Sequence, residues 1–262
     1  HQLHRRQRQM CIRDRSSGYG FSDRWQILEP LLSDPVLSVR AEAVGALVRH
    51  YPEMNPLQRD KIKQPLEDYM AIQRFNADRG FGRTNLANVY RDLGDTDKAI
   101  ASYQKAIEIE PYFENSYANL ADLYRAQGND KKALETLMAG IEAQPKSSAL
   151  PYSAGLAWLR VGDSVKANQY LKQAAETAER NPQYWYVYGL ALEKSDVLAA
   201  SKALNTAYKV GGNPQHLFAE CEVLARNYKD GFVAFAFEQC LKQLGEFAPA
   251  DVIQRLRASI NQ

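Results

Sequence analysis

Cysteine and histidine side chains are the first groups to consider for chemistry in this 262-residue sequence. No two cysteines form a Cys-x-x-Cys pair, so neither a zinc knuckle nor a covalently attached haem is indicated. No histidine pair has the His-Glu-x-x-His spacing of a zinc protease, and the sequence has no P-loop, Gly-x-Gly-x-x-Gly or Gly-x-Ser-x-Gly motif. We therefore expect a non-catalytic chain with no cofactor and no metal site. The residues considered are Cys11, Cys221, Cys240, His1, His4, His50 and His216.

Two of the cysteines occupy helix-packing positions of a repeat that is described next. Cys221 and Cys240 have the same spacing as Ala87 and Ala106. If the hairpin at Cys221 keeps the register in which Ala87 faces Ala99, its partner lies near Val233. Cys240 is then about 10 Å further along the helix axis, beyond disulfide reach. This register predicts two buried thiols rather than a disulfide.

One pattern occurs twice between Phe81 and Pro145, with every matched position 34 residues apart. Each copy has a large and a small residue followed by an aromatic residue, then a glycine, a second helical pattern and a closing proline. The first copy consists of Leu86, Ala87, Tyr90, Gly94, Ala99, Tyr103, Ala106 and Pro111. The second consists of Leu120, Ala121, Tyr124, Gly128, Ala133, Leu137, Gly140 and Pro145.

Local chemistry predicts an antiparallel helix pair in each copy. Leu86 and Tyr90 are four residues apart and share one helix face. Gly94 and Gly128 end the first helix, because glycine adopts the left-handed conformation at little cost. We expect helix pairs at residues 84–110, 115–143, 149–179 and 183–209. The third pair has a second helix lengthened through Glu179, because its closing Pro182 comes late.

The period and residue pattern resemble the tetratricopeptide repeat. This resemblance implies an all-α fold, an α-solenoid in which the hairpins form a right-handed superhelix. A separate string before the repeats resembles a HEAT repeat, so we expect a HEAT-like helix pair to precede the hairpins. This second resemblance rests on Asp34, Pro35, Val39, Ala43 and Leu47. The expected domains are a disordered or non-native tail at 1–20, the HEAT-like pair at 21–51, a linker helix at 52–79, four hairpins at 80–213, and a degenerate hairpin with a capping helix at 214–262.

The tetratricopeptide resemblance also implies a concave face lined by the first helix of each pair, where such proteins bind peptides. The first two pairs would offer polar and charged side chains, and the later pairs an aromatic and aliphatic stripe. That stripe either forms a partner site or is covered by neighbouring repeats. The candidate partner-binding residues are Asn88, Arg91, Asp122, Arg125, Tyr152, Leu156, Tyr186, Leu190 and Phe218.

One known form of recognition in this family is not expected. Chaperone adaptors hold a C-terminal carboxylate with two asparagines and three cations. Asn88 and Asn119 match the asparagines, but Thr84, Ala149 and Ser153 stand where the cations would be. Because a carboxylate needs charge-assisted hydrogen bonds, we exclude a carboxylate clamp.

Composition and charge restrict the other partners. The net charge is +2, with five arginines against one aspartate in residues 1–20. We interpret this tail as disordered or non-native rather than as a nucleic-acid-binding arm. No apolar run is long enough to span a membrane. The chain begins with histidine, so we interpret it as a fragment, and the absence of a signal peptide leaves its compartment open.

A wider resemblance covers about residues 25–210. A HEAT-like unit, the segment Gln73 to Arg79 and tetratricopeptide repeats are similar to the C-terminal region of bacterial secreted multihaem cytochromes c. This resemblance implies a docking or assembly arm of a redox protein whose haem domain lies upstream, and a periplasmic location. Otherwise the chain would be cytoplasmic, and its leading function is that of a protein-binding scaffold with an unidentified partner.

Overall fold

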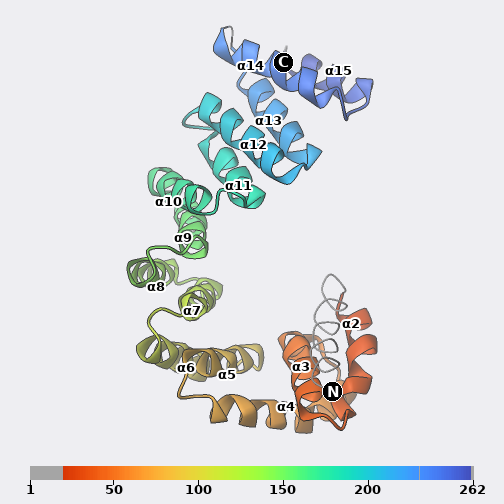
Figure 1. Ribbon diagram of the computed structural model, residues 1–262, viewed down its shortest axis with the longest axis vertical. Coiled ribbons are helices and arrows are strands. Elements are labelled where there is room, and N and C mark those ends of the chain that lie inside the picture. Colours follow the sequence, from red (N-terminus) through yellow and green to blue (C-terminus); the bar gives the residue numbers. More distant parts are fainter. Residues whose placement is uncertain (1–19, 230, 261–262) are drawn as a thin grey trace. The chain divides into compact units, whose positions relative to one another are not determined.

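The computed structural model describes residues 20–229 and 231–260, and the chain divides into two compact units, residues 1–127 and 128–262. The described residues form helices and no strand, which confirms the all-α prediction (Figure 1). The first unit contains α2 (Phe21–Leu28), the 3-10 helix η1 (Glu29–Ser33), α3 (Leu37–Leu47), the 3-10 helix η2 (Val48–Glu53), α4 (Pro56–Phe75), α5 (Gly80–Asp92), α6 (Thr96–Ile109) and α7 (Glu114–Ala126). The second contains α8 (Asp130–Ala143), α9 (Ala149–Arg160), α10 (Ser164–Thr177), α11 (Pro182–Leu192), α12 (Val197–Gly211), α13 (Pro214–Arg226), α14 (Phe232–Leu244) and α15 (Ala250–Ser259).

The segment before the repeats packs directly onto the first repeat. Leu28, Val44, Leu47 and Ile62 are fully buried in one core that also includes Val89 of α5. α4 starts with a capping box, in which Asn55 and Gln58 each accept a hydrogen bond from the other's backbone N–H. Pro65 lies inside α4 and does not split it into two helices.

The repeats form helix pairs for the reasons that the sequence indicates. Gly94 and Gly128 have φ values of +85° and +73°, in the region that glycine adopts readily, and each lies where a first helix ends. Aspartate or asparagine then caps the next helix: the side chains of Asp95, Asn129 and Asp163 accept the backbone N–H three residues later. The same local signal thus starts three second helices.

The predicted extension of the third repeat was wrong. α10 ends at Thr177 rather than continuing through Glu179. The extra residues before Pro182 instead form the connection to α11, in which the backbone N–H of Asn181 bonds to the carbonyl of Ala178. The late proline lengthens the connection and not the helix, because α10 already has the length of α6 and α8.

The predicted pair of free thiols was also wrong. Cys221 and Cys240 form a disulfide, with Cα atoms 5.6 Å apart. The loop of this fifth hairpin runs from Asn227 to Gly231, whereas the corresponding loop of the first repeat runs only from Leu93 to Asp95. The two extra loop residues move the position opposite Cys221 only from Val233 to Phe235, so the disulfide shows that the two helices of this hairpin also pack in a register different from the one expected from Ala87 and Ala99.

Candidate partner-binding site

In the first unit, Asn88 is held by hydrogen bonds from two neighbouring helices. The hydroxyl of Tyr103, on α6, donates to the amide oxygen of Asn88 at 2.5 Å, and the amide of Asn119, on α7, donates to the same oxygen at 3.1 Å. Tyr103 is fully buried, so the pairing is anchored in the core. With both lone pairs of this oxygen engaged, a partner could be bound only by the amide N–H groups of Asn88.

The charged candidates of this unit are paired locally. Arg91 bonds to Asp92, with Nη2 and Oδ1 2.7 Å apart, and it also approaches the Tyr103 hydroxyl at 3.5 Å. Burial raises the pKa of Tyr103 to about 12, so the phenol is neutral and can donate to Asn88. Arg125 pairs with Asp122 one helical turn away, and both side chains are exposed. This surface therefore offers two nearly compensated ion pairs rather than a cationic clamp.

In the second unit, the aromatic candidates contact the next first helix in the series α9, α11 and α13. Tyr152 stacks on Tyr184 of α11, with ring centroids 4.5 Å apart. Tyr186 lies 5.0 Å from the ring of His216 on α13. Tyr152, Tyr186, Leu156 and Phe218 are half-buried, while Leu190 is 38% exposed. The stripe is thus partly covered by neighbouring repeats and partly open.

Phe218 continues this series at a cleft between α13 and α15. The cleft has a volume of about 420 Å³ and is lined by Phe218, Glu222, Ala225, Arg226, Val252, Arg255, Leu256 and Ser259. Its apolar side chains come from both helices, and its charged groups come from two arginines, Arg226 and Arg255, and one glutamate, Glu222. Such a site suits an apolar side chain flanked by polar groups.

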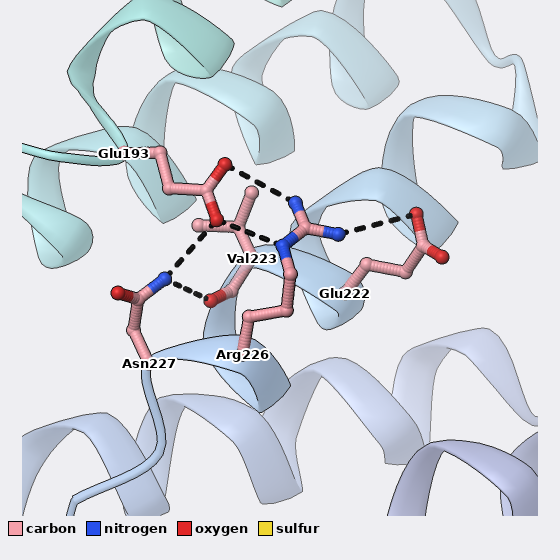
Figure 2. Close-up of polar contacts among 5 residues, drawn as sticks. All are labelled: Glu193, Glu222, Val223, Arg226 and Asn227. Carbon is pink, nitrogen blue, oxygen red and sulfur yellow. Dashed lines mark hydrogen bonds and ion pairs between the residues drawn. The ribbon is translucent and has the colours of Figure 1, made fainter. Parts of the chain in front are cut away.

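Arg226, which lines this cleft, is held by ion pairs that Figure 2 shows. Arg226 donates to both carboxylate oxygens of Glu193, at 2.9 and 3.1 Å, and Asn227 donates to the same carboxylate at 3.2 Å. The hydrogen bond from Arg226 lowers the pKa of Glu193, which therefore remains ionised. Glu222 lies 3.9 Å from the other side of the guanidinium.

Sequence reasoning missed three residues that position the candidates: Tyr103, Tyr184 and His216. The repeat pattern gives Tyr103 only a packing role, because its counterpart in the second repeat is Leu137, which has no hydroxyl. Tyr184 and His216 lie two residues before Tyr186 and Phe218, and their roles depend on how successive first helices pack. A period of 34 residues does not contain that information.

The family follows from comparison with known domains. Residues 70–257 match the family model described as the cilia and flagella-associated protein 70 C-terminal domain, a tetratricopeptide-repeat family. The chain belongs to this tetratricopeptide-repeat family. The match covers every helix from α5 to α14 and therefore includes the repeats that were recognised from their spacing. It does not test the HEAT-like reading of residues 21–51 or the resemblance to multihaem cytochromes, and no curated protein sequence matches the chain significantly.

Solved tetratricopeptide structures show the same fold at low identity. The C-terminal part of a TPR repeat-containing protein from Cytophaga hutchinsonii is similar over 95% of this chain and 98% of its own, with 13% identity and a TM-score of 0.59. YrrB, described as a TPR protein with an unusual peptide-binding site, is similar over 72% of this chain and 96% of its own, with 16% identity and a TM-score of 0.53. PilF of Pseudomonas aeruginosa is similar over 85% of this chain and 98% of its own, with 18% identity and a TM-score of 0.52. These similarities establish an α-solenoid fold.

Other kinds of site find no support in the described part of the chain. Residues 20–229 and 231–260 contain no group of three or more histidine, cysteine or acidic side chains placed to hold a metal ion. None of the described helices has the length and apolar character needed to cross a bilayer.

Proposed function

We propose that this chain is a non-catalytic interaction scaffold whose second unit binds a peptide segment of a partner protein through Tyr152, Tyr186 and Phe218. The observation that carries the proposal is the pair of aromatic contacts that join α9 to α11 and α11 to α13, together with the cleft lined by Phe218. Aromatic side chains in partly enclosed sites dominate binding energies at protein interfaces.

The partner side chain that enters the cleft is expected to be apolar. Phe218, Ala225, Val252 and Leu256 provide the apolar contacts, while Arg226 is already occupied by Glu193. Because the two arginines are offset by carboxylates, the cleft has no strong preference for charge. Asn88, Arg91, Asp122 and Arg125 form a separate polar surface on the first unit, which we expect to affect the association rate of a partner more than its affinity.

Selection from a displayed peptide library tests this function while the partner is still unidentified. Peptides that are enriched on the full chain should bind Tyr186→Ala and Phe218→Ala more weakly by about 1–3 kcal/mol. Arg91→Ala and Arg125→Ala should mainly change the salt dependence. Phe75→Ala is the matched control, because Phe75 is a highly exposed phenylalanine outside the site.

The outcomes separate the proposal from its competitors. Circular dichroism should show that each variant keeps its helix content. If the aromatic variants bind like the unmodified chain while the arginine variants do not, recognition lies on the polar surface of the first unit. If no peptide is enriched, or if Phe75→Ala weakens binding as much as Phe218→Ala, the proposed site is wrong.

In a second candidate function, the same surface belongs to a docking or assembly arm of a larger secreted redox protein. The disulfide between Cys221 and Cys240 favours it, because such bonds persist in oxidising compartments such as the periplasm. The test is to read the gene upstream of residue 21. Several Cys-x-x-Cys-His motifs and a signal peptide would support this function, and a start codon just upstream would rule it out.

A further inference from the structure

Three successive hairpins of the second unit expose an apolar side chain near the start of their second helix. Val165 on α10 is 79% exposed, Leu198 on α12 is 41% exposed, and Phe232 on α14 is 81% exposed. Earlier second helices have charged residues near this position: Asp97 on α6 and Lys131 on α8. The repeat fold therefore does not require an apolar residue there.

Hydrogen bonds between neighbouring hairpins place these three turns along one edge. The amide of Asn168, on α10, donates to the hydroxyl of Ser195 in the turn before α12, at 3.2 Å. The next pair of hairpins is joined at the same turn. Arg226 and Asn227 of the fifth hairpin bind Glu193, which lies in the turn that also contains Ser195 (Figure 2). Asn168 lies one helical turn after Val165, so these bonds hold the start of α10, the turn before α12 and the turn before α14 together, and the exposed apolar side chains lie along one edge.

The row protrudes instead of lining a cleft. Phe235 follows Phe232 one helical turn later and is 66% exposed, so two phenylalanines project from the start of α14. The cleft lined by Phe218 lies elsewhere, between α13 and α15, and another cleft lies at residues 176–182. A rigid protein partner would have to supply a matching pocket for each side chain, whereas the headgroup region of a bilayer accommodates protruding apolar groups without one.

A lysine accompanies each apolar side chain of the row. Lys166 follows Val165, Lys194 lies in the turn before Leu198, and Lys229 lies in the turn before Phe232. In the described part of the chain, Lys194 and Lys229 have no carboxylate within ion-pair distance. Lys166 differs, because its ammonium pairs with Asp163 at 3.4 Å and lies 4.1 Å from the ring of Trp158. Of the other nearby carboxylates, Asp196 caps α12 and Glu193 is bound by Arg226. Lysines beside apolar side chains are favourable at an anionic lipid surface.

We propose that this edge, formed by Val165, Leu198, Phe232 and Phe235 with Lys194 and Lys229, rests on the surface of an anionic lipid bilayer. The apolar side chains enter the headgroup region and the ammonium groups contact lipid phosphates. The contact is peripheral and does not depend on the peptide-binding function proposed above, because it uses the hairpin turns rather than the aromatic series.

Flotation of the full chain with phosphatidylcholine vesicles, with and without phosphatidylglycerol, tests this proposal. The chain should float with the anionic vesicles at low salt. Phe232→Ser combined with Phe235→Ser should weaken the partition by at least about tenfold, since two apolar side chains no longer leave water. Lys194→Gln combined with Lys229→Gln should weaken it several-fold on anionic vesicles only.

Phe75→Ser is the matched control, because Phe75 is 88% exposed at the end of α4 and lies outside this edge. It should leave vesicle binding unchanged. The proposal is overturned if the unmodified chain does not float with anionic vesicles, if neither double variant weakens the partition, or if Phe75→Ser weakens it as much as the double phenylalanine variant does. It is also overturned if size-exclusion chromatography shows a dimer that the Phe232 and Phe235 changes dissociate, because a second copy would then cover the edge.

Discussion

The hydroxyl of Tyr103 donates a 2.5 Å hydrogen bond to the amide oxygen of Asn88, which also accepts one from Asn119. A buried residue of a second helix thereby sets the orientation of a side chain on the candidate surface. The stability of the first repeat and the geometry of that surface consequently depend on the same phenol.

Removing this hydroxyl should lower stability with little change in packing. Tyr103→Phe should lower the free energy of unfolding by about 1 kcal/mol, because Asn88 loses one donor and Arg91 loses a neighbour. Urea titration followed by circular dichroism measures the loss. Tyr112→Phe, at an exposed tyrosine, is the control and should have no effect. Equal stabilities of the two variants would show that the hydrogen bond adds nothing net.

Replacing the repeated aromatic residue with alanine should lower the free energy of unfolding by different amounts in the two repeats. Tyr124 is 6% exposed, so Tyr124→Ala should lower the free energy of unfolding by about 3 kcal/mol or more. Tyr90 is only half-buried, with Lys98 above its ring at 5.7 Å, so Tyr90→Ala should cost clearly less. Chemical denaturation of both variants compares them directly. The reverse order would contradict the burial difference.

Buried Glu220 should make stability depend on pH. Its carboxylate accepts hydrogen bonds from Ser201 at 2.7 Å and Asn205 at 2.8 Å, yet burial raises its pKa above the ordinary 4.5. A raised pKa means that the folded chain holds this proton more tightly than the unfolded chain. The associated stability is present at low pH and is lost as pH rises from 4.5 through the folded pKa.

Glu220→Gln cannot titrate and should remove that part of the pH dependence. Denaturation midpoints measured from acidic to neutral pH should fall less steeply for Glu220→Gln than for the unmodified chain. Glu135→Gln, at an exposed position of α8, should keep the original slope. Identical slopes for all three proteins would mean that Glu220 has the same pKa in the folded and unfolded chain.

The disulfide should stabilise the C-terminal hairpin. Replacing Cys221 and Cys240 together with alanine should cost about 3 kcal/mol, because the unfolded chain regains the freedom of the closed loop. Thermal unfolding with and without reductant should shift accordingly, and mass spectrometry should detect the bridge. Cys11→Ser should leave both results unchanged. Free thiols at Cys221 and Cys240 in protein isolated under non-reducing conditions would refute the bridge.

Most of the fold could be predicted because the helix boundaries of each repeat are set by local interactions. Gly94 and Gly128 end helices, and Asp95 and Asn129 start the next ones, by interactions within a few residues. The two errors concern positions where spacing is the only guide. Pro182 marks the start of α11 and not the end of α10, and the helices of the fifth hairpin pack in a register that brings Cys240 rather than Val233 to Cys221.

The candidate site was less predictable, because its members depend on contacts between repeats. Position in the first helix identifies Tyr152, Tyr186 and Phe218 as candidates. It cannot show that Tyr152 is half covered by Tyr184, or that Phe218 borders a cleft, since the partners come from the next repeat and from α15. Similarly, the engagement of Asn88 by Tyr103 joins two helices through a hydroxyl that the repeat pattern does not require.

The bridge between Cys221 and Cys240 also determines how the chain would respond to mechanical force. Tension applied at the two ends passes through the covalent bond, so the 19-residue separation between the cysteines cannot be drawn out. At 3.3–3.6 Å per residue, roughly 65 Å of contour length is withheld until the bond is reduced. Stretching an oxidised chain would load the helices on both sides of the bridge, including α15 and the end of α14, while the loop between α13 and α14 bears no load.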